Sequence, residues 1–149
     1  MDGISRRLNS PYPEGRGACA AMQLSLDMAK LNPEDIGLIS AHGTSTQLED
    51  LSESRAIRRI FDHDVLVHST RSLIGHLIGA AGGAEAIAVA LALDRGIIHP
   101  TINQFEPDPK IDLNIVRNEP REVEVQHVLS NSFGFGGQNA TLVFSKFQA

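Results

Sequence analysis

Two histidines set among small residues are the side chains in this sequence best suited to chemistry. His42 opens the run His42-Gly-Thr-Ser-Thr46, and His76 closes the run Ser72-Leu-Ile-Gly-His76. Two neutral imidazoles that converge on one point can polarise a carbonyl group or stabilise a developing enolate. Together the two runs predict one wall of a site for acyl transfer. Taken alone, each histidine could instead satisfy a turn or cap a helix, so the prediction rests on the pair.

A glycine-rich segment near the C-terminus fits the same chemistry. The run Asn131-Ser-Phe-Gly-Phe-Gly-Gly137 could present backbone N–H groups to an oxyanion. It is not a phosphate loop, because no Lys-Ser or Lys-Thr pair follows it and the next residues have the pattern of a strand. A tight turn between two strands is the alternative that stays open.

No nucleophile accompanies these histidines in the sequence. The one cysteine, Cys19, falls in an alanine-rich helical pattern, and we interpret it as a small buried side chain. A metal site is the rival chemistry, with His42, Asp50, His68 and His76 as candidate ligands. Their spacing matches no compact metal-binding pattern and no His-Glu-x-x-His motif occurs, so no metal is predicted.

Hydrophobic periodicity and turn residues predict the elements that would position these side chains. A strand ending at Ala41 would deliver His42. A helix beginning at His76 would place that imidazole at a helix N-terminus, where the positive end of the helix dipole disfavours the imidazolium form. Helices are predicted over 18–29, 47–61 and 76–93, and strands over 36–41, 65–68, 111–116, 122–125, 128–130 and 140–145.

The predicted helix over 76–93 is apolar in every direction around its axis. A helix of this kind is buried on all sides, so we expect it to form a middle layer with protein on both faces. The chain would then be half of a larger unit, and on its own it would aggregate or form an oligomer that hides the helix. Glu85 is the only carboxylate within the apolar run, and a buried carboxylate needs a cationic partner, for which Arg71 is a candidate.

The composition fits one globular domain. The chain has 149 residues, of which 42% are hydrophobic, and a formal net charge of −5 at pH 7, which argues against a general nucleic-acid binder. No apolar run reaches the roughly 18 residues of a membrane span, and the first residues lack the apolar stretch of a signal peptide. A single cysteine suits a reducing compartment. We therefore expect a soluble, cytoplasmic protein.

Five segments in the same order make the sequence resemble one family, the β-ketoacyl-acyl-carrier-protein synthases, and above all its type II elongation enzymes. The segments are Ser10-Pro11, His42–Thr46, Ser72–Gly82, Pro100–Asn103 and Asn131–Gly137. The resemblance implies a thiolase-like α/β fold with a mixed sheet, in which two similar halves stack as five layers, α-β-α-β-α. Residues 1–149 would be the C-terminal half, and the nucleophilic cysteine would belong to an absent N-terminal half.

The resemblance also implies roles for individual residues. His42 and His76 would be the histidine pair that binds the malonyl thioester and promotes its decarboxylation. Arg71 stands where the family usually has lysine; it keeps the positive charge but is planar and far harder to deprotonate. Glu85 would be its carboxylate partner. Phe135 would be the gating phenylalanine, whose backbone N–H contributes to the oxyanion hole.

Residues that would contact the substrate follow from the same resemblance. Thr44 and Thr46 match residues that line the entrance for phosphopantetheine. Phe133, Gly134 and Gly136 of the glycine-rich segment would also bind the substrate. No cofactor is expected beyond the phosphopantetheine that carries the substrates.

The function implied is a decarboxylating Claisen condensation in fatty-acid or polyketide synthesis. Its partners would be acyl carrier protein and an N-terminal synthase half or partner subunit, in an oligomer. Three alternatives stay open. The chain could be a non-catalytic subunit that resembles a chain-length factor, a thiolase or another member of the same fold, or a metal hydrolase.

Overall fold

The computed structural model describes residues 14–148, so the Ser10-Pro11 segment lies outside the described residues. Its centre is a five-stranded mixed sheet in the order β4-β2-β1-β6-β7. The first four strands in this order are parallel, and β7 pairs antiparallel with β6. The predicted α/β class with a mixed sheet is confirmed. The strands are β1 (Ile36–Ser40), β2 (Leu66–His68), β4 (Asn114–Ile115), β6 (His127–Phe133) and β7 (Asn139–Ser145).

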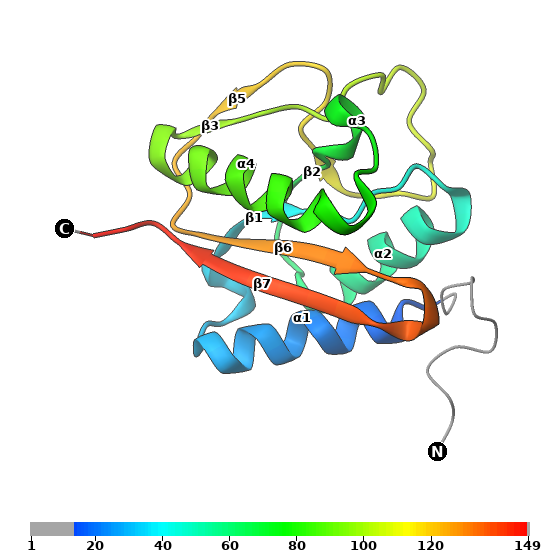
Figure 1. The fold of residues 1–149 in the computed structure, drawn as a ribbon, viewed down its shortest axis with the longest axis horizontal. Helices are drawn as coiled ribbons and strands as arrows, with labels where there is room; N and C mark the ends of the chain where they lie inside the picture. Colours follow the sequence, from blue (N-terminus) through cyan, green and yellow to red (C-terminus); the bar gives the residue numbers. More distant parts are fainter. Residues whose placement is uncertain (1–13, 149) are drawn as a thin grey trace.

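Helices cover both faces of this sheet and give the described part of the chain three layers (Figure 1). α1 (Arg16–Ala29) and α2 (Gln47–Ile60) lie on one face, and α4 (Ala81–Arg95) lies on the other. α1 and α2 lie close to their predicted positions, whereas α4 begins after the predicted start at His76. Gly96 ends α4 in the left-handed conformation with φ 65°, as expected of a C-terminal glycine. No helix among the described residues is long and apolar enough to cross a bilayer.

The two central strands divide the hydrophobic core in two, because successive side chains of a strand point to opposite faces. Ile39 of β1 and Leu129 of β6 pack in the core beneath α1 and α2. Leu38 and Val128, their neighbours along the same strands, pack in the core beneath α4. β1 and β6 pair in parallel, with Ser40 opposite Ser130, so the carboxyl end of β1 lies beside β6.

The remaining elements are short. β3 and β5 form a separate two-stranded antiparallel sheet. The strand predicted over 122–125 is therefore shorter and earlier in the structure, where β5 consists of Arg121–Glu122. The short elements are η1 (Pro33–Asp35), α3 (Arg71–Ile74), η2 (Ile78–Ala80), β3 (Ile97–Ile98), β5 (Arg121–Glu122) and η3 (Phe135–Gly137).

The prediction that a helix begins at His76 is wrong. The chain first makes α3, which ends at Gly75 with φ 76°, and α4 begins only at Ala81. His76 lies in the connection between them, where Ile78 also has a positive φ of 51°. The imidazole therefore lies in a turn, and the argument from a helix dipole does not apply to it. The physical reason is the pair of glycines around His76, which lower the stability of a continuous helix.

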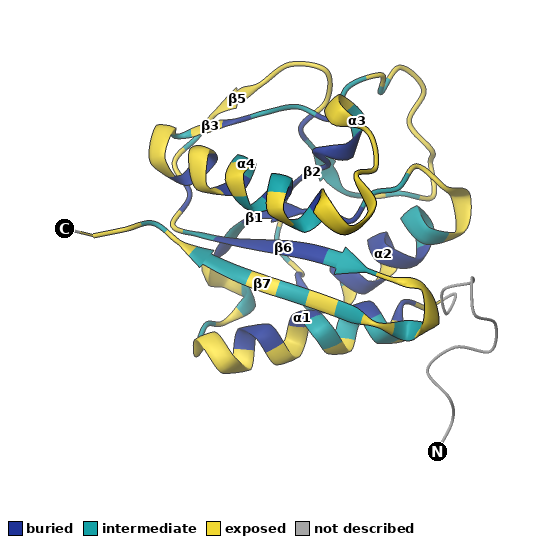
Figure 2. Cartoon of the chain, viewed as in Figure 1, coloured by how far each residue is buried: buried dark blue, intermediate teal, exposed yellow. Residues whose placement is uncertain are grey.

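One face of α4 is buried and the other is open. Glu85 and Val89 are buried against the sheet, whereas Ile87 is 65% exposed and Leu91 is 43% exposed (Figure 2). The burial of this helix on both faces thus stays a prediction.

Candidate active site

Four segments meet at the carboxyl ends of the parallel strands. His42 follows the end of β1, Ser69 and Arg71 follow the end of β2, and Phe133 is the last residue of β6. Neighbouring parallel strands end at the same edge of a sheet, which is where open α/β sheets place their ligands. The connection that carries His76 follows α3 and lies beside His42 at this edge.

The two imidazoles are adjacent, and each accepts a hydrogen bond from a backbone N–H group. Their ring centroids lie 5.9 Å apart, with the ring planes nearly perpendicular at 88°. Nδ1 of His42 accepts a hydrogen bond from the backbone N–H of Phe133 at 3.2 Å, and Nδ1 of His76 accepts one from the N–H of Ile78 at 3.1 Å. Because Nδ1 is the acceptor in each ring, the proton of each neutral imidazole lies on Nε2. The pair thus offers two N–H donors.

Burial keeps His42 neutral. Only 6% of this residue is exposed, and the loss of hydration on burial is the main reason that its pKa falls from 6.5 to about 4. The positive charge of Arg71 lowers this pKa further, and Glu49 acts in the opposite direction. An imidazole with this pKa is a hydrogen-bond donor and a weak base at neutral pH.

The depressed pKa of His42 predicts a specific titration. We expect its ring to change protonation state near pH 4 and to stay neutral from pH 6 upwards, because burial and Arg71 disfavour the imidazolium. Nitrogen chemical shifts of the ring, followed by NMR from pH 3 to 8, would measure this. A midpoint near 6.5 would mean that the ring is hydrated and that the described site does not form in solution.

A buried carboxylate holds the backbone of His42, and sequence reasoning did not predict it. Glu53 of α2 accepts hydrogen bonds from the N–H groups of His42 and Gly43, both at 3.0 Å, and from Nδ2 of Asn131 at 3.0 Å. Burial raises the pKa of Glu53, and the two backbone donors oppose this rise. A signal was present in the sequence: Glu53 precedes Ala56 and Ile57 by three and four residues, so it lies on the apolar face of the helix.

Gly43 lets the chain turn immediately after His42. Its φ is 43°, and a Cβ at this position would lie 2.6 Å from Oγ of Ser69. The same Ser69 hydroxyl donates to the carbonyl oxygen of Gly43 at 3.1 Å. The turn that carries His42 is thus fixed against the end of β2 on one side and against Glu53 on the other.

The predicted pairing of Arg71 with Glu85 is confirmed. Nη1 of Arg71 lies 2.8 Å from Oε1 of Glu85, and both side chains are almost completely buried. The same nitrogen donates to the carbonyl oxygen of His42. Burial raises the pKa of Glu85 to about 7 despite the attraction of Arg71, which lowers it. Arg71 thus links the backbone of His42 to the central carboxylate of α4.

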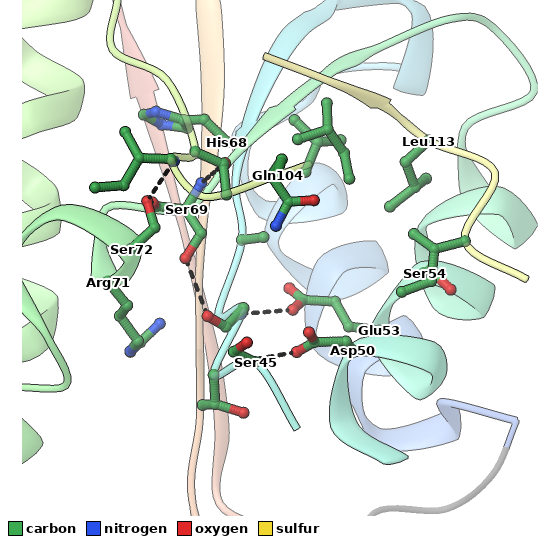
Figure 3. A pocket seen from close by; sticks show the side chains of 18 of the residues that line it. Ser45, Asp50, Glu53, Ser54, His68, Ser69, Arg71, Ser72, Gln104 and Leu113 are labelled. Carbon is green, nitrogen blue, oxygen red and sulfur yellow. Dashed lines mark hydrogen bonds between the residues drawn. The ribbon is translucent and has the colours of Figure 1, made fainter. Parts of the chain in front are cut away.

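A cavity of about 400 Å³ opens beside His76. Figure 3 shows the carboxylates of Asp50 and Glu53 on one side of it, with Ser69, Ser72 and Arg71 on the other. Its far wall is apolar, formed by Ile57, Val67, Ile111, Leu113 and Ile115. Thr44 also lines the cavity, and its hydroxyl donates to Glu49, as does that of Thr46.

The glycine-rich segment reaches the site mainly through Phe133. The Phe133 ring lies 5.5 Å from the His42 ring, between centroids, and its N–H orients that imidazole. Gly134 donates to the carbonyl of Gln138 across a tight turn, and Gly136 has a φ of 76°. Phe135 is 75% exposed. The gating role of Phe135 and the substrate contacts of Gly134 and Gly136 stay predictions.

Cys19 and the other histidines occupy different surroundings. Cys19 lies on α1 and packs against the core beneath α1 and α2. The ring of His68 contacts that of His99, with centroids 4.1 Å apart and ring planes tilted by 44°. Within residues 14–148, no three His, Cys, Asp or Glu side chains are grouped so that they could hold a metal ion.

The chain is similar to one family of curated proteins. Residues 2–105 match the family described as β-ketoacyl synthase, C-terminal domain. The chain is 45% identical over 150 residues to 3-oxoacyl-[acyl-carrier-protein] synthase 2 of Staphylococcus aureus (strain COL), in an alignment that covers 99% of this chain and 36% of that protein. It thus spans about a third of the length of the curated relatives it matches.

Solved ketosynthase structures have the same fold. One contains an acyl-carrier protein of a type II polyketide synthase in complex with its ketosynthase; a chain of it is 28% identical, with a TM-score of 0.94 over 98% of this chain and 36% of that chain. Another is a ketosynthase in complex with its chain length factor from Xenorhabdus doucetiae, 36% identical, with a TM-score of 0.83 over 97% of this chain and 37% of that chain. These likenesses confirm the thiolase-like fold for the part that the chain spans.

Proposed function

Because the chain belongs to the β-ketoacyl synthase family and contains its C-terminal domain, we propose that it supplies the histidine pair of a condensing enzyme. A malonyl thioester on a carrier protein would lose carbon dioxide, and the electron pair of the broken C–C bond would form an enolate. The enolate carbon would then attack the acyl thioester of a cysteine and expel the cysteine thiolate. The product is a 3-oxoacyl thioester. The proposal requires this cysteine from a part of the enzyme outside the 149 residues.

The observation that carries this proposal is the orientation of the two imidazoles. Both accept a backbone N–H at Nδ1, so both carry a proton on Nε2 and are hydrogen-bond donors there, and the two rings lie 5.9 Å apart between centroids. An enolate oxygen carries more negative charge than the thioester oxygen from which it forms. Two fixed donors therefore stabilise the transition state of decarboxylation more than they stabilise the bound substrate.

Arg71 would act through His42 as a positioning residue. It holds the His42 carbonyl oxygen and the buried Glu85 at once, and its charge helps to keep the imidazole unprotonated. The partners in this proposal are acyl carrier protein and the segment or subunit that bears the cysteine, in an oligomer, in the cytoplasm. Phosphopantetheine of the carrier protein would hold both substrates, with Thr44 and Thr46 at its entrance.

The test is a condensation assay with the assembled enzyme. The two substrates are carrier protein loaded with a malonyl group and carrier protein loaded with an acyl group. Together they are expected to give equal amounts of carbon dioxide and 3-oxoacyl product. Formation of an acyl-enzyme on Cys19 would contradict the assigned arrangement, because that side chain is partly buried and packs against the core beneath α1 and α2.

The alternative is a non-catalytic subunit that resembles a chain-length factor, which the likeness to 3-oxoacyl-[acyl-carrier-protein] synthases does not favour. Arginine at position 71, where lysine was expected from the resemblance, is the feature that makes a test worthwhile. Arg71→Lys in the assembled enzyme discriminates between the two. A large gain in condensation would indicate a chain that has lost activity, whereas an unchanged or lower rate would indicate a working variant in which arginine positions His42.

A further inference from the structure

The segment Pro100–Asn103 is one of the five on which the sequence resemblance rests, yet the proposed reaction gives it no role. Thr101 joins this segment to the edge of the main sheet. Its backbone N–H donates to the carbonyl oxygen of Val116 at 2.7 Å, and its own carbonyl accepts the N–H of Asn118 at 2.9 Å. Thr101 also forms a parallel bridge with Arg117. The sheet edge therefore fixes the backbone of Thr101 independently of α3.

Two hydrogen bonds join this segment to residues before and after Arg71. Oγ1 of Thr101 accepts the backbone N–H of Ser69 at 2.9 Å, and both residues are buried. The N–H of Ile102 donates to Oγ of Ser72 at 3.1 Å. Figure 3 shows Ser69, Arg71 and Ser72 on one wall of the cavity. The guanidinium is thus carried by a stretch of chain that is held on both sides.

A third bond holds Thr70, the residue directly before Arg71. Nδ1 of His99 lies 3.0 Å from the carbonyl oxygen of Pro100, so Nδ1 carries the proton of the neutral ring. Nε2 of His99 is therefore an acceptor, and the hydroxyl of Thr70 donates to it at 3.0 Å. α3 has only four residues, and a helix this short is not stable without contacts to the rest of the fold. Its position therefore depends on these three bonds.

The residues held in this way themselves hold the turn that carries His42. Oγ of Ser69 donates to the carbonyl oxygen of Gly43 at 3.1 Å, and Nη1 of Arg71 donates to the carbonyl oxygen of His42. Glu53 accepts the N–H groups of the same two residues from the other side. A displacement of residues 69–71 would thus release one side of the backbone of His42.

We propose that Thr101 is a positioning residue for the histidine pair, an inference that rests on the proposed function. It acts through Ser69 and Arg71 on the backbone of His42. A valine at position 101 has nearly the same shape but cannot accept the buried N–H of Ser69, which would have to move to find another partner. Because a misplacement of about 1 Å can slow a reaction about 100-fold, a small shift of Arg71 is sufficient to affect decarboxylation.

The first test is the rate of carbon dioxide release from a malonyl thioester in the assembled enzyme. Thr101→Val is expected to lower kcat about tenfold. Thr101→Ser retains the acceptor oxygen and should stay within about twofold of the parent. Ser25→Ala removes another buried hydroxyl, which donates to the carbonyl oxygen of Met22 on α1 at 2.7 Å, and should also stay within about twofold. Equal rates for Thr101→Val and the parent would overturn the proposal.

The titration of His42 separates this inference from a general loss of structure. Burial and, after it, the positive charge of Arg71 lower the pKa of His42 to about 4. Thr101→Val should raise this pKa by about 0.5 or more as the guanidinium moves away, measured from the nitrogen chemical shifts of the ring. In a background that already carries Arg71→Leu and Glu85→Leu, the same substitution should leave the pKa unchanged, because no guanidinium remains to move.

A merely structural role of Thr101 would open the site to water and raise the pKa of His42 in both backgrounds, which would contradict the proposal. An unchanged pKa in Thr101→Val alone would contradict it as well. If the parent enzyme released no carbon dioxide, the proposed function would fail, and the two titrations would still decide whether Thr101 positions His42 through Arg71.

Discussion

Replacing His42 by alanine in the assembled enzyme is expected to slow the decarboxylation of a malonyl thioester by about 100- to 1,000-fold, the usual effect of removing one donor from an oxyanion site. The substitution deletes one of the two Nε2–H groups and leaves His76 alone to stabilise the enolate. The initial rate of carbon dioxide release measures this step directly. Transfer of an acyl group to the enzyme should fall much less, since that step forms no malonyl enolate.

The matched control for this prediction is His127→Ala. His127 begins β6, at the opposite end of the strand from Phe133, and contacts the hydroxyl of Ser145 at 2.8 Å. Its removal should leave the rate of carbon dioxide release within about twofold, as for surface substitutions away from a site. His42→Gln, whose side-chain amide retains N–H donors, should recover part of the loss. Equal rates for the parent and for His42→Ala would show that this imidazole does not bind the enolate.

Arg71→Leu is expected to lower the free energy of unfolding by about 3–5 kcal/mol at pH 8, because it leaves the buried carboxylate of Glu85 without its cation. Burial already raises the pKa of Glu85 to about 7 in the folded protein, from an ordinary value of 4.5. A raised pKa of an acid means that folding disfavours the ionised form. This destabilisation is absent below pH 4.5, grows between pH 4.5 and pH 7, and is constant above pH 7.

The loss in Arg71→Leu should therefore depend on pH. Without the guanidinium, the pKa of Glu85 rises further, so at pH 5 the carboxyl is protonated in both proteins and the deficit is smaller than at pH 8 by about 1.4 kcal/mol, the value of the one pH unit between the parent pKa of about 7 and pH 8. Urea unfolding at pH 5 and at pH 8 measures the difference. The double variant Arg71→Leu with Glu85→Leu should regain most of the stability at pH 8.

A control for the loss of charge is available on the same helix as Glu85. Arg95 lies in the last turn of α4 and is exposed. Arg95→Leu should change the free energy of unfolding by less than about 0.5 kcal/mol at either pH. A loss in Arg71→Leu that is the same at pH 5 and pH 8 would mean that Glu85 is not ionised in the parent.

The parts of the site that could be predicted from the sequence are those that depend on the hydrophobic pattern of a single strand or helix. The strand before His42 has a plain apolar run, and its end places the histidine at the sheet edge. The pairing of Arg71 with Glu85 followed from the cost of burying one carboxylate in an apolar helix. Both inferences need only neighbouring residues and a general rule of burial.

The backbone conformation around His76 and the role of Glu53 could not be predicted from the sequence pattern. A run of small and apolar residues predicts a helix, but the positive φ values of Gly75 and Ile78 break it. The glycines around His76 lower the stability of a helix without excluding it, and a positive φ at an isoleucine is not indicated by its residue type. Glu53 bonds to Asn131, which is 78 residues away in the sequence. A contact between such distant positions depends on how β6 enters the sheet, which periodicity alone does not specify.

The bond between Glu53 and Asn131 has a consequence for the order of folding. His42, Gly43 and Glu53 can meet within a short stretch of chain, but the N–H that orients the His42 ring belongs to Phe133, 91 residues later. β6 lies between β1 and β7, so the imidazole acquires its orientation only after this late strand has been synthesised and inserted. A nascent chain still lacking β6 would thus hold His42 beside an open sheet edge, and the maturation of the site would be among the last steps of folding.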